Sequence, residues 1–150
     1  WSPSWSTQFR ISLMDSEVEQ LLDNNATGSI TIDGRNYDPV DRATTRLMPP
    51  QFHFVTRYAP PQSNWWGDFS ILAVGRADDL SLKDQTDSSR IPSNGTPGYA
   101  LFGISGGRKW GEDSSVFFAV ENLSDVDYRV HGSGLNGGGR NFIFSFSRSF

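Results

Sequence analysis

Cysteine is absent from the sequence, and so are long hydrophobic runs. The lack of cysteine excludes disulfide bonds, thiolate metal sites and a cysteine nucleophile, although it leaves the redox environment open. A membrane-spanning helix needs about 20 consecutive apolar residues, so the short apolar runs of this chain predict no such helix. A transmembrane β-strand needs only about 9–11 residues, of which every second one is apolar, so a membrane protein built from strands is still allowed.

Positive charge is neither in excess nor clustered. The chain has 13 Lys and Arg against 17 Asp and Glu, a net charge of -4, and the basic residues are scattered. Nucleic-acid-binding domains present clustered basic residues, so we expect no nucleic-acid partner. Aromatic residues, by contrast, make up 13% of the chain, and there are 15 glycines. That composition favours β-strands joined by many turns.

Six segments alternate apolar and polar residues with the two-residue period of a β-strand. They are residues 5–14, 51–58, 65–75, 99–109, 115–123 and 140–150. In the last segment Phe142, Phe144 and Phe146 alternate with serine or isoleucine, and the segment ends at Phe150. Residues 15–23 allow a helical turn or two, which is too short and isolated to change the class. The pattern predicts an all-β, antiparallel fold.

The links between the six segments alternate strictly between long and short. Residues 15–50, 78–98 and 124–139 form long polar links, whereas residues 59–64 and 111–113 form short ones. Bacterial outer-membrane barrels have this asymmetry, with short periplasmic turns and long extracellular loops. On that interpretation the C-terminus lies on the periplasmic side.

The alternation itself fits two architectures. In a soluble β-sandwich or small barrel the apolar face turns inward, whereas in a membrane barrel it meets lipid and the polar face lines the lumen. Here the apolar face is bulky and aromatic. The opposite face carries ionisable side chains, namely those of Arg10, His53, Arg57, Asp68 and Glu121. This contrast favours the membrane barrel, with a soluble β-domain as the alternative.

Tryptophans lie near the ends of these segments, at Trp5, Trp65, Trp66 and Trp110. Tryptophan is enriched where a membrane meets water, and barrels have aromatic girdles at both interfaces. All four residues fall at the end that the link lengths assign to the periplasm. We therefore expect them to form an interfacial girdle.

Three motifs lie in the last 60 residues, at 91–99 (IPSNGTPGY), 121–129 (ENLSDVDYR) and 131–142 (HGSGLNGGGRNF). They resemble, in this order, the approach to the third-last strand, an EN-L-D-DYR segment and the approach to the final strand at the C-terminal end of TonB-dependent outer-membrane receptors. Residues 41–50 (DRATTRLMPP) carry a weaker similarity. The residues that carry the resemblance, for which it implies structural roles, are Gly98, Tyr99, Asn122, Tyr128, Gly132, Ser133, Gly139, Arg140 and Phe150. Arg148 departs from the family, which usually has an aromatic residue there.

The resemblance implies a transmembrane barrel of 22 strands, of which this chain would supply about six C-terminal ones without the plug domain. Six strands cannot close a transmembrane barrel, since the smallest bacterial form has eight. We therefore expect residues 1–150 to be a fragment or a truncated gene product.

The same family implies a location and a function. The intact protein would be a receptor in the bacterial outer membrane that takes up a scarce nutrient, most often siderophore-bound iron, with energy from the TonB complex. Its further partners would be outer-membrane lipid and the barrel-assembly machinery. The alternative from a different class is a soluble β-domain that acts as a binding or structural module.

We expect no catalytic, cofactor-binding or metal site, and hence no enzyme. Residues 132–137 spell G-x-G-x-x-G, but a predicted strand follows them where a dinucleotide site needs a helix. The two histidines, His53 and His131, have no partner at metal-ligand spacing. The acidic residues Asp78, Asp79, Asp84 and Asp87 match no EF-hand loop, so a solvated acidic loop is favoured over a calcium site. Because ligand specificity in such receptors is spread over loops and plug, no ligand-binding residues are assigned.

Overall fold

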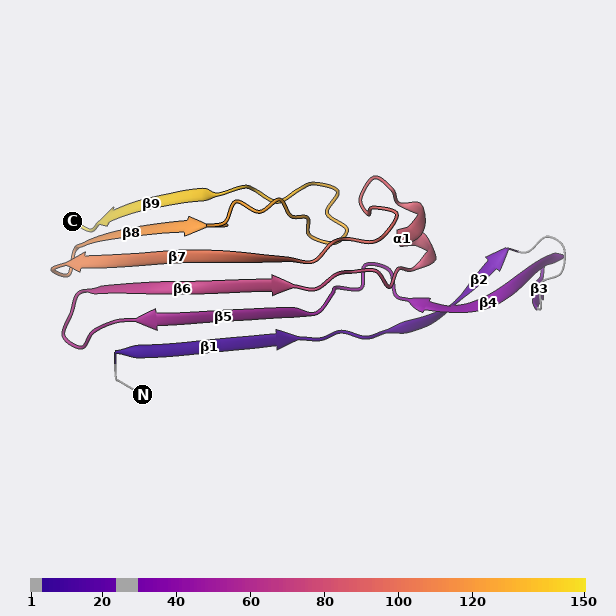
Figure 1. Cartoon of the computed structure of the whole chain (residues 1–150), viewed down its shortest axis with the longest axis horizontal. Helices are drawn as coiled ribbons and strands as arrows, with labels where there is room; N and C mark the ends of the chain where they lie inside the picture. The colour runs from indigo at the N-terminus through magenta and orange to yellow at the C-terminus, as the bar shows by residue number, and fades with distance from the viewer. Residues whose placement is uncertain (1–3, 24–29) are drawn as a thin grey trace.

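The computed structural model describes residues 4–23 and 30–150, which form two antiparallel β-sheets and one short helix (Figure 1). The larger sheet has the strand order β1-β5-β6-β7-β8-β9. Its strands are β1 (Trp5–Ser12), β5 (Gln51–Tyr58), β6 (Trp65–Val74), β7 (Tyr99–Trp110), β8 (Ser114–Glu121) and β9 (Asn141–Arg148). The predicted all-β, antiparallel class is confirmed.

Each of the six segments predicted to be a strand is a strand of this sheet, with ends that differ by at most two residues. Consecutive strands of the sheet are antiparallel neighbours, joined by alternating long and short links (Figure 1). Among the described residues, β1 and β9 each pair with a single strand, so the sheet is open. The 22-stranded barrel, and the assignment of residues 1–150 to its C-terminal part without a plug, stay predictions.

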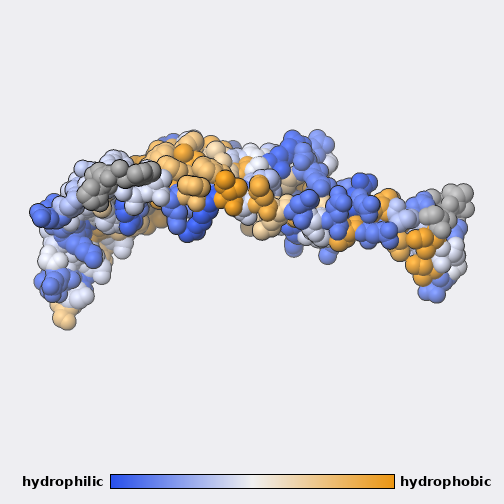
Figure 2. Space-filling model, turned by 90° about the horizontal axis from the view of Figure 1, so that it is seen from below, coloured by the Kyte–Doolittle hydropathy of each residue, from blue (hydrophilic) through white to orange (hydrophobic). Residues whose placement is uncertain are grey.

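The register gathers the exposed large apolar side chains on one face of the larger sheet. Phe9 stands opposite Phe54, and Phe118 opposite Phe144. These rings are not packed under another layer: Phe9 is 69% exposed and Phe144 71%. In the side view of Figure 2 the molecule is arched, and the hydrophobic surface lies on the convex side over the sheet, with hydrophilic surface beneath it. The sheet therefore has an uncovered apolar face on its convex side.

Aromatic rings at the short-link end divide between the two faces. Trp5, Tyr58 and Trp65 pack together on the apolar face, with ring centroids 4.7 Å apart for the first pair and 5.6 Å for the second. Trp66 lies on the opposite face, because successive residues of a strand point to opposite sides. Its ring centroid is 5.9 Å from that of Phe117. The prediction that Trp66 belongs to a girdle with the other tryptophans is wrong.

The first long link contains a sheet of its own, which projects from the larger sheet beyond its long-link end (Figure 1). Its strand order is β2-β4-β3, formed by β2 (Glu17–Asp23), β3 (Ile30–Ile32) and β4 (Arg35–Ala43). The helical turn considered for residues 15–23 is wrong, since β2 pairs with β4 along its whole length. An isolated helix of nine residues is only marginally stable, and pairing with β4 supplies a full ladder of hydrogen bonds instead.

The second long link contains the helix α1 (Leu82–Thr86), preceded by Ser81 as its N-cap. The Ser81 hydroxyl accepts a hydrogen bond from the backbone N–H of Asp84 at 3.1 Å, which satisfies one of the free donors of the first turn. No helix in the described part of the chain is long and apolar enough to cross a membrane.

Candidate functional site

Charged side chains lie on the face of the larger sheet opposite the exposed aromatic rings. Arg57 and Asp68 are cross-strand partners on β5 and β6. Two parallel hydrogen bonds join them, from Nε to Oδ1 at 2.7 Å and from Nη2 to Oδ2 at 2.8 Å. The guanidinium also stacks over the ring of Trp66, 4.2 Å from its centroid, in a cation–π contact. This polar face therefore holds an ordered ion pair.

A hollow of about 590 Å³ opens on the same polar face, next to the long links. Such a volume is in the range of small-molecule pockets. Its ionisable and hydrogen-bonding residues include His53, Glu121, Tyr128, Arg140 and Asn141. The amide of Asn141 donates a hydrogen bond to the carboxylate of Glu121 at 3.3 Å. The hollow could accept a polar molecule or another part of the protein.

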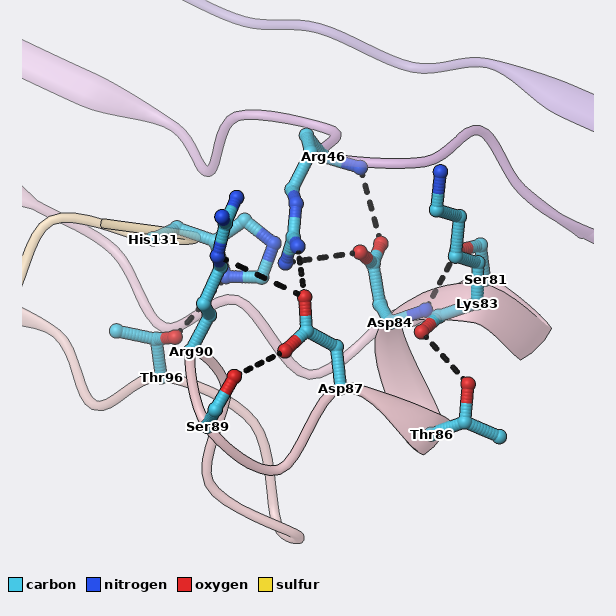
Figure 3. Close-up of polar contacts among 10 residues, drawn as sticks. All are labelled: Arg46, Ser81, Lys83, Asp84, Thr86, Asp87, Ser89, Arg90, Thr96 and His131. Atoms are coloured by element: carbon cyan, nitrogen blue, oxygen red, sulfur yellow. Dashed lines mark hydrogen bonds and ion pairs between the residues drawn. The ribbon is translucent and has the colours of Figure 1, made fainter. Parts of the chain in front are cut away.

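The long links meet in a cluster that we call the loop clasp, made of Arg46, Asp84, Asp87, Thr96 and His131 (Figure 3). The backbone N–H of Arg46 donates to Asp84 Oδ2 at 2.9 Å, and its guanidinium Nη1 lies 3.1 Å from Asp84 Oδ1. The other guanidinium nitrogen, Nη2, donates to Asp87 Oδ2. Arg46 thus ties the segment before β5 to the helix α1.

The last long link joins the clasp through His131. Its Nδ1 is hydrogen-bonded to the hydroxyl of Thr96, with 2.9 Å between the two atoms, and both residues are buried. The neighbouring Gly132 has φ of +77° and lies against the side chain of Arg46. A Cβ at this position would stand 2.8 Å from Arg46 Cδ, so only glycine fits both the backbone conformation and the contact.

Burial and pairing set the charge states in the clasp. The hydroxyl of Ser89 and then the guanidinium of Arg46 hold the pKa of Asp87 below its usual value. Burial lowers the pKa of His131, and the nearby carboxylate of Asp84 opposes this shift by raising the pKa. Asp84 is only 1% exposed, so the prediction of a solvated acidic loop is wrong for this residue. At neutral pH the ionised carboxylate of Asp87 therefore pairs with Arg46, and the nearby imidazole of His131 is neutral.

Asn122, a residue of the resemblance, organises the start of the last long link. It adopts φ of +48°, and its amide nitrogen donates to the carbonyl oxygens of Val126 at 2.9 Å and Gly138 at 3.1 Å. Its amide oxygen accepts from the N–H of Val126 at 2.9 Å. One side chain therefore holds both ends of the link.

Most of the other residues of the resemblance lie around the same link. Asp125 accepts a hydrogen bond from the N–H of Arg140 at 2.8 Å, and a Cβ on Gly139 would stand 2.9 Å from the same carboxylate. The Arg140 guanidinium Nε donates to the carbonyl of Leu123 at 2.9 Å. The hydroxyl of Ser133 donates to the carbonyl of Leu135 at 2.7 Å.

The remaining residues of the resemblance lie where β7 begins and where β9 ends. The rings of Tyr99 and Tyr128 pack with centroids 4.7 Å apart, and a Cβ on Gly98 would stand 2.8 Å from the carbonyl oxygen of Val74. Phe150 lies at the opposite end of the sheet and is fully exposed, with the guanidinium of Arg148 5.3 Å from its ring centroid. The structural roles that the resemblance implies for these residues stay predictions.

Two elements of the long links have local signals in the sequence. Asp33-Gly34 joins β3 to β4 with φ of +48° and +78°, and Asp-Gly between apolar runs is a strong hairpin signal. Ser81 followed three residues later by an acid, Asp84, is the pattern of a helix N-terminus. The clasp itself has no local signal, because Arg46 and Asp84 are 38 residues apart.

No group of three or more His, Cys, Asp or Glu that could hold a metal ion is found within residues 4–23 and 30–150. The G-x-G-x-x-G run lies in the last long link, and the element that follows it is the strand β9. Gly132 and Gly134 of this run have positive φ and serve the turns of the link.

Comparison with known proteins gives a likeness in structure alone. No family model matches the sequence, and no curated protein matches it. Among the solved structures that match is a chain described as the copper transporter OprC, with a TM-score of 0.61 and 18% sequence identity. The match covers 73% of this chain and 18% of that chain. The chain therefore shares its fold with a part of this transporter. The likeness shows the fold alone.

Proposed function

We propose that residues 1–150 form part of the wall of a β-barrel receptor in the bacterial outer membrane, which imports a scarce nutrient. The observation that carries the proposal is the uncovered apolar face of the larger sheet. Phe9, Phe142 and Phe144 are 69%, 66% and 71% exposed, with no other layer of the described residues over them. Burying one such side chain contributes about 1.5–3 kcal/mol, which lipid would supply here and water would not.

The curvature of the sheet supports the same assignment. A soluble sandwich or small barrel encloses its apolar face, whereas this sheet carries it on the convex side (Figure 2). The ion pair of Arg57 and Asp68 lies on the other face, which in a barrel lines a water-filled lumen. Lipid does not tolerate unpaired strand edges, so further strands would pair with β1 and β9 to complete a barrel, which we propose has 22 strands.

The cargo and the energy source are proposed from the sequence motifs. They resemble receptors that take up siderophore-bound iron with energy from the TonB complex, and we propose that cargo class here. The structurally similar chain is described as a copper transporter. Copper is therefore the alternative cargo to test against siderophore-bound iron. Outer-membrane lipid and the barrel-assembly machinery are the further partners, and no catalytic step is part of the proposal.

Uptake by cells separates these cargoes. Cells that lack the intact gene should take up less radioactive iron from a panel of iron–siderophore complexes, and a plasmid copy should restore the uptake. A normal iron uptake together with reduced copper accumulation would contradict the siderophore assignment while retaining transport. Normal uptake of both would contradict the nutrient import proposed here.

The orientation has its own experiment, since residues 1–150 contain no cysteine. Single cysteines replace Asn94, in the link between β6 and β7, and Gln62, in the link between β5 and β6, in an otherwise cysteine-free protein. A membrane-impermeant maleimide applied to whole cells should label the cysteine at Asn94 and leave the one at Gln62 unlabelled until the cells are lysed. Equal labelling in whole cells would contradict the orientation.

A further inference from the structure

The loop clasp is the place where segments from the long links are held together by charge and hydrogen bonds. Arg46 reaches across 38 residues to Asp84, and Thr96 reaches across 35 residues to His131. Arg46 is the central member, since it binds both carboxylates and lies against Gly132 beside the histidine (Figure 3).

The projecting sheet is anchored beside the same cluster. The side-chain oxygen of Gln20 on β2 accepts a hydrogen bond from the N–H of Leu82, the first residue of α1, at 3.1 Å. At the base of the sheet, the N–H of Thr44 donates to the carbonyl of Ser16 at 3.2 Å, and Ala43 is fully buried. The β2-β4-β3 sheet is therefore attached through Gln20 to α1, the helix that carries Asp84 of the clasp.

We propose that the loop clasp is a proton-operated latch, closed while His131 is neutral and released when the imidazole is protonated. In the closed state the Thr96–His131 hydrogen bond holds the last long link against the second one. In acidic surroundings the last link, residues 124–139, separates from α1 and from Arg46.

The charge balance around the imidazole is the reason. The ionisable groups that face this region are Arg46 from the segment before β5, Asp84 from α1, and Asp87 and Arg90 from the turn after it (Figure 3). Two arginines already balance two carboxylates, both of which are bound to Arg46. A proton on His131 adds an unbalanced positive charge at a site that is only 8% exposed, and an uncompensated buried charge is strongly unfavourable.

The latch has a distinct pH range. Burial lowers the pKa of His131, so its proton binds more tightly in the open form than in the closed one, and opening begins below the ordinary histidine value of about 6.5. Asp87 stays ionised throughout this range, because its pKa lies below its usual value. The other histidine of the chain, His53, lies on β5 outside the clasp, which makes it the matched control.

The test is hydrogen–deuterium exchange of the intact protein in detergent, measured by mass spectrometry between pH 7.5 and 5.0 and corrected for the intrinsic exchange rate. In the wild type, peptides from residues 87–98 and 124–139 should lose protection below about pH 6.5, by up to about tenfold per pH unit. Peptides from β5 and β6 should not change. His53→Asn should behave as the wild type, and His131→Asn should remove the pH dependence.

A wild-type profile that is flat from pH 7.5 to 5.0 overturns the proposal, and so does a pH dependence that persists in His131→Asn. If both peptides of His131→Asn are unprotected at every pH, the variant gives no information about the proton, and the pH profile of exchange in the wild type tests the proposal. Loss of protection that begins near pH 6.5 then supports the latch, whereas a loss confined to pH values near 5.0 overturns it in favour of carboxylate titration.

Discussion

Arg57 and Asp68 stand directly opposite each other on neighbouring strands. The side chain of Phe69, the next residue after Asp68, points to the other face of the sheet. Neighbouring residues of one strand thus carry a charged side chain on one face and an aromatic ring on the other. On the polar face the Arg57 guanidinium meets the carboxylate at 2.7 Å and stacks on Trp66. On the apolar face the rings of Phe69 and Phe102 stack with centroids 6.4 Å apart.

Removing the Arg57–Asp68 pair should cost little stability. The side chain of Arg57 is 47% exposed, so water screens the pair, and exposed pairs are worth about 1 kcal/mol or less. Urea unfolding of Arg57→Gln, Asp68→Asn and the double variant should give a coupling free energy in that range. A coupling free energy above about 3 kcal/mol, the range of a buried pair, would show that the polar face is not exposed to water.

Substituting Asn122 should lower the free energy of unfolding more than substituting its exposed neighbours in the last link. Asn122→Ala removes three hydrogen bonds and also strains a backbone with φ of +48°. We expect the free energy of unfolding to fall by about 2–3 kcal/mol. Asn122→Gly loses the same bonds but tolerates the backbone, so it should recover about 1 kcal/mol. Equal losses in the two variants, measured by urea unfolding, would contradict the backbone part of this account.

Stability at acidic pH should depend on Asp87. Its pKa in the folded chain is lowered by the Ser89 hydroxyl and by Arg46, so its contribution is complete above the ordinary Asp value of about 3.9. That contribution is lost as the pH falls through the lower folded value. Asp87→Asn should therefore lower the urea midpoint at pH 5.5 and narrow the difference between pH 5.5 and pH 3.0. Asp79→Asn, on the same link but exposed, is the control, and the same narrowing there would refute the assignment.

A positive charge should be tolerated on one face of β1 and not on the other. Phe9 lies on the apolar face, and Gln8 beside it points to the polar face. An arginine facing lipid costs about 2–4 kcal/mol near the middle of the bilayer. Phe9→Arg should reduce the amount of assembled protein in outer-membrane fractions and lower its urea midpoint, and Gln8→Arg should change neither. Similar behaviour of the two variants would argue against the lipid-facing assignment.

The larger sheet was predictable because its signals are local. Each strand carries its own two-residue alternation, as in Phe142, Phe144 and Phe146, and the register then follows from keeping one face apolar. The prediction for Trp66 was wrong because a position near a strand end does not determine which face of the sheet a tryptophan occupies. Its parity in β6 already places it opposite Trp65.

The loop clasp was not predictable from local patterns. Arg46, Asp84 and His131 come from different long links, and a lone arginine or aspartate in a polar link has the composition of a solvated loop. Which of these residues pair depends on how the long links fold back over the end of the sheet. The projecting sheet is intermediate. Its Asp33-Gly34 turn is a local signal, whereas the pairing of β2 with β4 joins residues 14 to 26 positions apart, from Asp23 with Tyr37 to Glu17 with Ala43.

The central claim is that the convex apolar face meets lipid and the concave polar face meets water. Adjacent residues of β9 test it, because Phe144 lies in a row with Phe118 and Ser145 points to the other face. Single cysteines at these positions, labelled with bimane, are measured in bilayers of ordinary and of brominated lipid. We predict strong quenching by brominated lipid at position 144 and little at position 145. Equal quenching, or stronger quenching at position 145, would contradict the account.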